Sequence, residues 1–315
     1  MNIFEFLGLG KLHRKLSNKV TQLVKHYDEV PQSRKTGKRL AMQVKRDGVC
    51  AITVVSKEGV KIFSRTGNLF TNTGYITEEL RGMNLPFGIY MGEMLVQKDI
   101  ASLEEFSGVV NPNRVNSLSH EMSTVPLFIE MHFFDILPTT AFVKGASGTP
   151  YHKRHEILKG ILSKRDSEKV VALEYTNMID EDHLDEFLQE LIKDGEEGAV
   201  IRDLDAGWEA GHKGWRVMKR VRGVDYDLAC IGIEEGTGKY KGKAANLIFK
   251  WKGDETITCM LGKGWGHKDA EEFFINPPIG EIFQVYALEE SSKGKLRLPK
   301  VGEKRHDKTY SDINV

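Results

Sequence analysis

Short runs of alternating apolar and polar residues dominate the first two thirds of the chain and predict β-strands. Asp47-Gly48 and Glu58-Gly59, which separate three of these runs, are typical of hairpin turns. Helical patterns stand among the strands without regular alternation, which favours an antiparallel α+β fold over a doubly wound sheet. The predicted strands are 40–44, 49–56, 60–64, 87–96, 127–136, 199–202 and 215–220, and the predicted helices are 12–27, 151–164 and 181–193.

The pattern changes after Gly223. Five short strands and one helix in so short a segment predict a small β-barrel of the OB-fold type. We therefore expect two domains, residues 1–223 and residues 224–315. The strand candidates of the second domain are 226–233, 246–252, 256–261, 282–288 and 295–299, with a helical stretch at 267–274.

Composition restricts the classes of protein that these elements can form. The 315 residues carry 45 Lys+Arg and 45 Asp+Glu, and 40% are hydrophobic, which excludes a disordered tail and a collagen-like fibre. No stretch of ~18 apolar residues predicts a membrane helix, and the first residues have the wrong charge order for a signal peptide. Three cysteines without a CxxC pair indicate a reducing compartment. We expect a soluble protein without a membrane partner, in a bacterial or phage-infected cytoplasm.

The zero net charge hides an uneven distribution. Residues 1–46 contain eleven Lys/Arg against three acids, whereas residues 180–197 contain nine acids against one lysine. The acidic run is typical of a solvated helix face. The basic run favours contact with nucleic-acid phosphates, which Lys and Arg bind in a salt-dependent manner. Overall neutrality therefore does not exclude a polyanionic substrate.

Lys45-Arg46-Asp47-Gly48 places a lysine at the end of a predicted strand, immediately before a tight turn. A lysine becomes a nucleophile when desolvation or neighbouring positive charge lowers its pKa. The tetrapeptide is common in turns, so its weight depends on the motifs that accompany it. Those motifs follow in order: Ser64-Arg65-Thr66-Gly67, Gly92-Glu93-Met94, Phe133-Phe134-Asp135-Ile136, Glu197-Gly198-Ala199-Val200-Ile201, Trp215-Arg216-Val217-Met218-Lys219 and Arg305-His306-Asp307-Lys308.

This ordered series resembles the covalent nucleotidyltransferase superfamily and, within it, the ATP-dependent DNA ligases. The compact phage and viral ligases, which lack an extra DNA-binding domain, look most similar. The resemblance extends from about residue 40 to residue 308. It implies an adenylation domain followed by an OB-fold, a lysyl-AMP intermediate formed from ATP, and a monomer that seals nicks in duplex DNA.

The resemblance also implies how the nucleotide is held. Lys45 is the implied nucleophile on the α-phosphorus of ATP, with Val44 and Asp47 beside it in the same motif. Phe134 is the implied stacking partner of adenine, since a planar ring packs well on a planar base. Gln43 stands where the family reads the adenine edge.

Charged residues of the other motifs receive implied roles as well. Glu93 is expected to hold the ribose and Glu197 to bind the divalent metal, with both carboxylates in the expected metal set. Mg²⁺ or Mn²⁺ needs few carboxylates where phosphate oxygens and waters complete its shell. Arg65 is expected to contact the ribose or the 5′-phosphate of DNA, and Lys219 the α-phosphate of ATP.

Arg305, Asp307 and Lys308 match an element that, in the family, orients the pyrophosphate leaving group. Its presence favours a DNA ligase or an mRNA-capping guanylyltransferase over an RNA-joining ligase. Two positions depart from the family pattern: Cys50 replaces an arginine, and Val217 replaces the first of two lysines. Each departure removes positive charge, which leaves open a non-catalytic nick-binding protein on a ligase scaffold.

Overall fold

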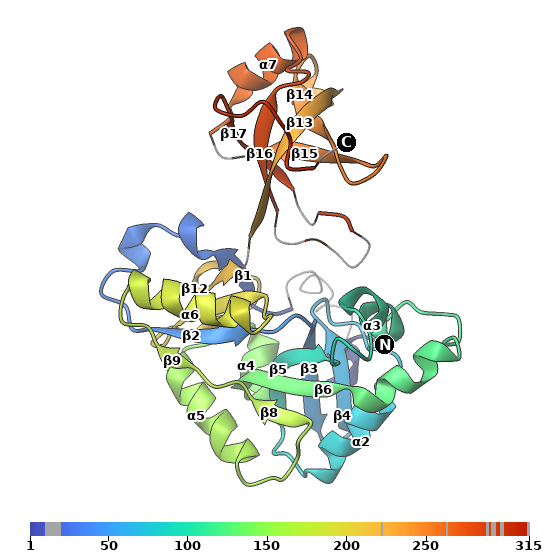
Figure 1. The fold of residues 1–315 in the computed structure, drawn as a ribbon. Coiled ribbons are helices and arrows are strands. Elements are labelled where there is room, and N and C mark those ends of the chain that lie inside the picture. The colour runs from blue at the N-terminus through green and yellow to red at the C-terminus, as the bar shows by residue number, and fades with distance from the viewer. Residues whose placement is uncertain are drawn as a thin grey trace. The chain divides into compact units, whose positions relative to one another are not determined.

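A computed structural model describes residues 1–9, 20–221, 223–262, 264–287, 290, 294–296 and 299–313. The chain forms two compact units, residues 1–221 and residues 222–315 (Figure 1). The first combines sheets with helices and the second contains a closed β-barrel. The α+β fold with a small barrel after it is therefore confirmed. Among the described residues, the helices are too short or too polar to cross a membrane.

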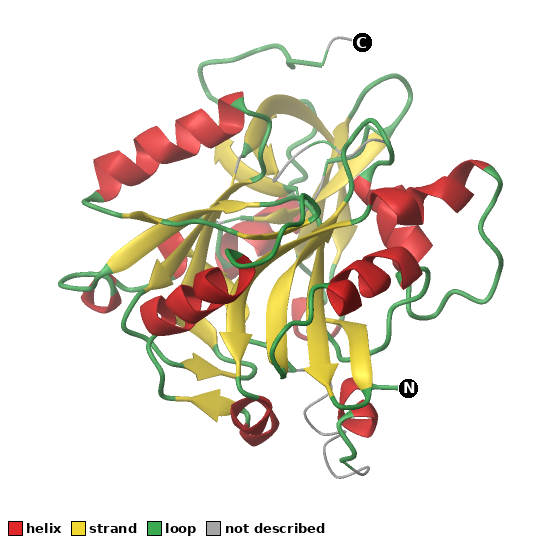
Figure 2. Ribbon diagram, turned by 90° about the horizontal axis from the view of Figure 1, so that it is seen from below, coloured by secondary structure: helices red, strands yellow, loops and turns green. Residues whose placement is uncertain are grey.

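Two five-stranded sheets form the first unit. Their strand orders are β1-β12-β10-β2-β9 and β4-β3-β5-β6-β8, and β11 pairs with β7. Helices pack around the outside of the strands (Figure 2). The strands are β1 (Leu23–His26), β2 (Leu40–Lys45), β3 (Val49–Ser56), β4 (Gly59–Ser64), β5 (Gly88–Leu95), β6 (Glu130–Leu137), β7 (Ala146–Ser147), β8 (Val170–Ala172), β9 (Thr176–Asn177), β10 (Gly198–Asp203), β11 (Trp208–Glu209) and β12 (Lys213–Val221).

Two longer helices of the first unit agree with the predicted patterns. The helix predicted at 151–164 ends at Leu162, and the one predicted at 181–193 has those bounds. Asp180 caps the latter by accepting a hydrogen bond from the backbone N–H of His183 at 2.8 Å. The pattern missed the shorter helices. The helical segments are α1 (Ile3–Phe6), η2 (Tyr27–Glu29), η3 (Gln32–Arg34), α2 (Gly74–Gly82), α3 (Leu103–Val110), η4 (Glu121–Phe128), α4 (Thr139–Lys144), α5 (Tyr151–Leu162) and α6 (Glu181–Lys193).

The first sheet has one apolar and one polar face, because successive side chains of a strand point to opposite sides. In β2, β10 and β12 the apolar side chains pack in one cluster with two leucines of α6. The alternate positions of the same strands, 43 and 45 in β2 and 200 and 202 in β10, turn to the opposite face. The apolar cluster includes Met42, Ala199, Ile201, Met218, Leu184 and Leu191.

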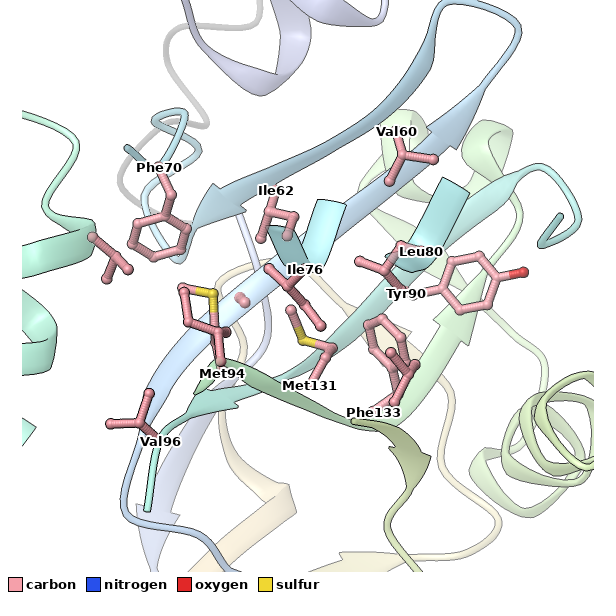
Figure 3. Packing of buried hydrophobic residues seen from close by; sticks show 14 of the residues in the cluster. Val60, Ile62, Phe70, Ile76, Leu80, Tyr90, Met94, Val96, Met131 and Phe133 are labelled. Carbon is pink, nitrogen blue, oxygen red and sulfur yellow. The ribbon is translucent and has the colours of Figure 1, made fainter. Parts of the chain in front are cut away.

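The second sheet carries apolar side chains on both faces, and helices cover one of them. Side chains from β4, β5 and β6 interlock there with those of α2, and the Tyr90 and Phe133 ring centroids lie 5.4 Å apart (Figure 3). This packing holds β5 and β6 rigidly, and both strands carry residues of the predicted site. The residues that Figure 3 labels are Val60, Ile62, Phe70, Ile76, Leu80, Tyr90, Met94, Val96, Met131 and Phe133.

The helix predicted over 12–27 is wrong in the part that can be compared. Leu23–His26 forms β1, parallel to β12, and Tyr27–Glu29 is a single 3₁₀ turn. The backbone N–H of Leu23 bonds to the carbonyl of His212 at 2.9 Å. A free edge of β12 therefore outweighed the local helical spacing. Leu12 and Leu16 lie outside the described residues.

The hairpin expected at Asp47-Gly48 is also wrong. β2 pairs with β10 and β9, whereas β3 pairs with β4 and β5, so the chain changes sheets between Lys45 and Val49. At the crossing, a Cβ on Gly48 would lie 2.7 Å from the Met94 carbonyl oxygen. The glycine thus allows a close backbone approach rather than a hairpin. The turn before Gly59 does join two paired strands, β3 and β4.

The second unit is a closed five-stranded barrel, in the order β13-β14-β15-β17-β16. Four strands and the helix follow the prediction, but the fifth strand is 300–304 rather than 295–299. Leu296 is buried and forms only an isolated bridge with Glu290, so the apolar residue packs in a loop ahead of the ladder. The elements are β13 (Val224–Glu235), η5 (Gly238–Tyr240), β14 (Ala244–Lys250), β15 (Thr256–Leu261), α7 (His267–Ile275), β16 (Ile282–Ala287) and β17 (Lys300–Lys304).

Candidate active site

A pocket in the first unit lies on the polar face of β2 and β10, against β5 and β6. Strand alternation explains the polar lining, since the apolar positions of β2 and β10 are used beneath α6. Six residues that the sequence predicted for the site line this pocket although they come from four separate segments. They are Gln43, Val44, Lys45, Arg65, Glu93 and Phe134.

Lys45 ends β2 at the position that pairs with Gly198 of β10. Its ammonium group donates a hydrogen bond to the carboxylate of Glu197, the residue before that glycine. Gly198 has a φ of 149°, and a Cβ there would lie 2.4 Å from the carbonyl oxygen of Arg220. Only glycine fits this position, so the Glu-Gly pair brings the carboxylate to the lysine. The neighbouring residues Arg46 and Glu196 form a second ion pair.

Glu93 supplies a second carboxyl group near the same lysine. Burial raises the pKa of Glu93 to about 8, and the negative charges of Glu197 and Asp47 act in the same direction. The positive charges of Lys45 and Arg65 oppose this rise without cancelling it. Ionisation of Glu93 is therefore unfavourable in this pocket, and burial is the main cause.

A buried carboxyl group whose ionisation is unfavourable suits a divalent cation, which would stabilise its charged form. No group of three or more His, Cys, Asp or Glu among the described residues could hold a metal by itself. Glu93 and Glu197 are close enough for their charges to interact, and a bound cation would relieve that repulsion. Mg²⁺ accepts such a small protein share when phosphate oxygens and waters complete its shell. The donor set thus fits magnesium bound together with a nucleotide.

Phe134 occupies an irregular position in β6. The ladder pairs Gly92 with Phe133 and Met91 with Asp135, so Phe134 is an extra residue without a partner in β5. Phe133 is fully buried in the core, whereas Phe134 is half-buried and lines the pocket. The bulge separates the two rings and leaves the second one available for stacking.

Arg202 is a pocket residue that sequence reasoning missed. It is buried, and its guanidinium carbon lies 4.6 Å from the centroid of the Phe134 ring and 4.8 Å from that of Tyr151. Its Nε donates a hydrogen bond of 2.7 Å to Oε1 of Gln43. The available signal was the alternation of β10, which turns residues 200 and 202 to the same face as Lys45.

The two departures from the family pattern also line the pocket. Burial raises the pKa of the Cys50 thiol to about 12, so this side chain is neutral near pH 7. Val217 pairs directly with Arg202 across β10 and β12, and partner residues in a sheet share one face. An arginine on the neighbouring strand therefore stands beside the position of the missing lysine. Lys219 pairs with Val200 on the same face, and it is not among the lining residues.

Two arginines close to Val217 in the sequence are engaged outside the pocket. Arg216 forms an ion pair with Glu209 at 2.9 Å. Arg220 pairs with Asp185 of α6 at 2.5 Å, on the face opposite the pocket. Neither side chain lines the pocket.

The remaining predicted residues form a cluster inside the second unit. Arg305 donates to Asp227 at 2.7 Å and to Asp307 at 2.9 Å, and Lys308 pairs with Asp227 and with Asp312. Hydrogen bonding to Arg305 lowers the pKa of Asp307 to about 2. Each cation of this cluster is thus satisfied within the barrel itself.

Comparison with known proteins identifies the family. A family model described as the ATP dependent DNA ligase domain matches residues 21–220, and one described as the DNA ligase OB-like domain matches residues 235–305. A lysine-lined pocket in a domain of this fold, followed by an OB-like barrel, is the architecture that the two family models describe. The chain belongs to the ATP-dependent DNA ligase family.

Individual relatives are distant. The DNA ligase of Thermoplasma volcanium is 27% identical over 269 residues, covering 78% of this chain and 43% of that protein. The chain spans less than half the length of the curated relatives it matches most strongly. The solved structure Pmar-Lig_PreS3 superposes with a TM-score of 0.74 at 22% identity, covering 90% of this chain and 67% of that one. A Lig E DNA ligase, described as binding DNA with a minimal scaffold, gives 0.67 at 17% identity and covers 90% and 98%. These two structures establish a shared fold.

Proposed function

We propose that this protein is an ATP-dependent DNA ligase that seals nicks in duplex DNA. The adenylation domain would comprise residues 1–223 and the OB-fold domain residues 224–315. The observation that carries the proposal is Lys45, held at a pocket beside Glu93 and Glu197, with the Phe134 ring lining the same pocket. A nucleotide with its base against Phe134 would present its phosphates to the lysine.

In the first step the Nζ of Lys45 attacks the α-phosphorus of ATP. The N–P bond forms as the bond to the bridging oxygen breaks, so pyrophosphate leaves and AMP remains on the lysine. Glu197 accepts the hydrogen bond from Lys45 and is placed to receive its proton. Glu93 would hold the ribose, while Arg65 and Lys219 would balance phosphate charge. Arg305, Asp307 and Lys308 would orient the pyrophosphate.

Two transfers then complete the reaction. An oxygen of the 5′-phosphate at the nick attacks the phosphorus of the lysyl-AMP, which breaks the N–P bond and frees Lys45. The 3′-hydroxyl next attacks the activated 5′-phosphate, and AMP leaves as the phosphodiester bond forms. Val44 and Asp47 flank the lysine throughout. Magnesium or manganese held by Glu93 and Glu197 would supply positive charge to the phosphates.

A basic surface near β12 fits the DNA backbone. The charged groups of Arg34, Lys38 and Arg216 each lie within 5.5 Å of the Trp215 ring centroid. Arg34 and Lys38 are exposed. Cations held together over an indole form a site for phosphates, because the ring offsets part of their repulsion. We name this group of four residues the Trp215 basic cluster.

The decisive experiment is sealing of a 5′-phosphorylated nick by the purified chain with ATP and Mg²⁺. We expect ligated product on an all-DNA duplex and a monomer by light scattering, and the same assay with RNA-containing strands measures the strand preference. Labelling with radioactive ATP or GTP, followed by denaturing electrophoresis, separates the capping alternative, since that enzyme would take label from GTP. Nick binding without a covalent adenylate would instead establish the non-catalytic alternative. Fractionation of the source cells would test the cytoplasmic location.

A further inference from the structure

The amide of Gln43 is held from both ends in the pocket. Its Nε2 donates to the carbonyl oxygen of Leu173 at 3.0 Å, and its Oε1 accepts from Nε of Arg202 at 2.7 Å. A carbonyl can only accept and a guanidinium can only donate, so the two partners dictate which end is oxygen and which is nitrogen. Rotating the amide by half a turn would set donor against donor and acceptor against acceptor.

The partners of this amide are themselves fixed. The backbone N–H of Leu173 bonds to the carbonyl of Phe133 at 2.8 Å, and the Leu173 carbonyl also contacts Nε2 of His155 at 2.7 Å. The Tyr151 hydroxyl donates to the carbonyl of Phe134 at 2.9 Å. Burial raises the pKa of Tyr151, and a hydrogen bond from Gln43 acts in the opposite direction. The single hydroxyl proton of Tyr151 is already donated to Phe134, so Tyr151 accepts in its hydrogen bond with Gln43. The amino group of Gln43 therefore serves both Leu173 and Tyr151.

One atom of the Gln43 amide can still accept a hydrogen bond from a ligand. Both N–H groups of the Gln43 amide are used, and one lone pair of Oε1 accepts from Arg202, so the second lone pair of Oε1 is the amide's open acceptor. The guanidinium that sets this arrangement is buried between the Phe134 and Tyr151 rings, at 4.6 and 4.8 Å from their centroids. Adenine offers a donor at its 6-amino group, whereas guanine and hypoxanthine offer an acceptor at O6.

We propose that Arg202 is a positioning residue for base selection, which holds the Gln43 amide so that the pocket accepts a 6-amino purine and rejects a 6-oxo purine. The inference rests on the proposed function, because it requires the base to lie beside Gln43 and Phe134. The O6 atom of a 6-oxo purine would lie against Oε1 of Gln43. Both atoms are acceptors, so both would be left without a hydrogen bond in a buried site. Sites built on such polar contacts reject the mismatched ligand strongly.

The test compares ATP with inosine triphosphate, which carries O6 without the extra 2-amino group of guanine. Covalent labelling of the full chain is measured over a range of each nucleotide, to give an apparent KM and a maximal rate. We expect the wild type to favour ATP, and Arg202→Met to reduce the ATP/ITP ratio of rate over KM by about ten-fold or more, the loss expected for one charge-assisted hydrogen bond. The loss should lie mainly in KM for ATP, since Lys45 is untouched.

Arg165→Met is the matched control. This arginine donates hydrogen bonds to the backbone carbonyls of Met83 and Asn84 instead of to a glutamine side chain, and it does not line the pocket. We expect it to keep the wild-type ratio. A fall in labelling by both nucleotides alike in Arg202→Met, with an unchanged ratio, would mark a purely structural role and overturn the inference.

Two further variants separate positioning from independent effects. Gln43→Met should lower the ATP/ITP ratio by itself, and adding Arg202→Met should lower it no further. An equal loss in both backgrounds would overturn the inference. Arg202→Lys keeps the charge and should retain part of the selectivity, which guards against a misfolded methionine variant. Wild-type protein that takes label from ITP in preference to ATP would overturn both the inference and the proposed function, whereas normal ATP labelling with an unaltered ratio in Arg202→Met overturns the inference alone.

Discussion

Two charged clusters, one in each unit, shift the pKa of a carboxyl group in opposite directions. Beside Lys45, burial raises the pKa of Glu93 to about 8. In the barrel, hydrogen bonding to Arg305 lowers the pKa of Asp307 to about 2. Both clusters combine lysine, arginine and acids, so composition alone does not separate them. The difference lies in how the charges are matched and buried.

In the barrel, Asp227 forms ion pairs with both Arg305 and Lys308. Arg305 also pairs with Asp307, and Lys308 also pairs with Asp312. The charges are balanced before any ligand arrives. A contact between these cations and a pyrophosphate must therefore replace ion pairs that already exist.

Beside Lys45, Glu197 accepts the hydrogen bond of the ammonium group, while burial makes ionisation of Glu93 unfavourable, and in this sense the cluster is unbalanced. A cation or a hydrogen-bonding ligand improves this cluster instead of disrupting it. The comparison indicates that an unbalanced cluster marks a binding site, whereas a balanced one stabilises the fold until a ligand competes.

The largest expected effect follows from removing the cation of the unbalanced cluster. Lys45→Ala should abolish covalent adenylate, with a loss of at least ~10³-fold, because a nucleophile cannot be replaced by its neighbours. Labelling with ATP, resolved on denaturing gels, measures this. Lys164→Ala, an exposed lysine just after α5, is the control and should label normally. A labelled Lys45→Ala protein would show that another group is the nucleophile.

The sequence was sufficient to predict the nucleophile segment and most strands, because both depend on local pattern. The KRDG motif and the Glu-Gly dipeptide at 197–198 lie where the strand ends meet. The alternation of 133 and 134 separated a core ring from a pocket ring. What alternation could not reveal is the bulge that frees Phe134, since a bulge depends on the partner strand.

Other features could not be read from one segment at a time. β1 follows from the free edge of β12, which is nearly two hundred residues away in the chain, and it overrode a helical pattern. The role of Arg202 depends on Gln43, Tyr151 and Phe134, which arrive from three different segments. Such residues become visible only when the sheet register is known.

The second largest expected effect is on stability and concerns the ion pairs of Asp227 in the barrel, the balanced cluster. Asp227→Ala would remove the buried partner of both Arg305 and Lys308, and we expect the free energy of unfolding to fall by ~2 kcal/mol, because two ion pairs are lost and each cation keeps only its exposed partner. Urea denaturation of the full chain measures the change. Asp225→Asn, on the same strand and exposed, should be nearly neutral. Equal stability of both variants would mean that the barrel does not depend on the matched charges.

The cluster beside Lys45 predicts that stability depends on pH through a buried carboxyl group whose pKa is raised on folding. Since the pKa of Glu93 rises from 4.5 to about 8 on folding, its protonated form stabilises the fold, and this stability is lost as pH rises from about 5 to 8. Glu93→Gln should remove that loss. The Tm of the wild type should therefore fall relative to that of the variant by several °C or more over this range and level off above pH 8. Glu58→Gln in the exposed β3–β4 turn is the control. Parallel Tm profiles of Glu93→Gln and the wild type would contradict the raised pKa.

The smallest expected effect is on DNA binding and concerns the Trp215 basic cluster, in which cations are held by an aromatic ring. Here an aromatic face holds Arg34, Lys38 and Arg216 together. Arg34 is exposed and available to DNA phosphates, whereas Lys38 already lies 3.8 Å from the buried carboxylate of Asp203. Arg34→Ala should weaken binding to a nicked duplex a few-fold and reduce the slope of log K against log salt by about one unit, since one phosphate contact is lost. Fluorescence anisotropy over a KCl series measures both values. Lys57→Ala, equally exposed in the β3–β4 turn, should change neither if the cluster is a specific contact surface rather than part of a general positive field. An identical change in slope for Lys57→Ala would assign the binding to net charge alone.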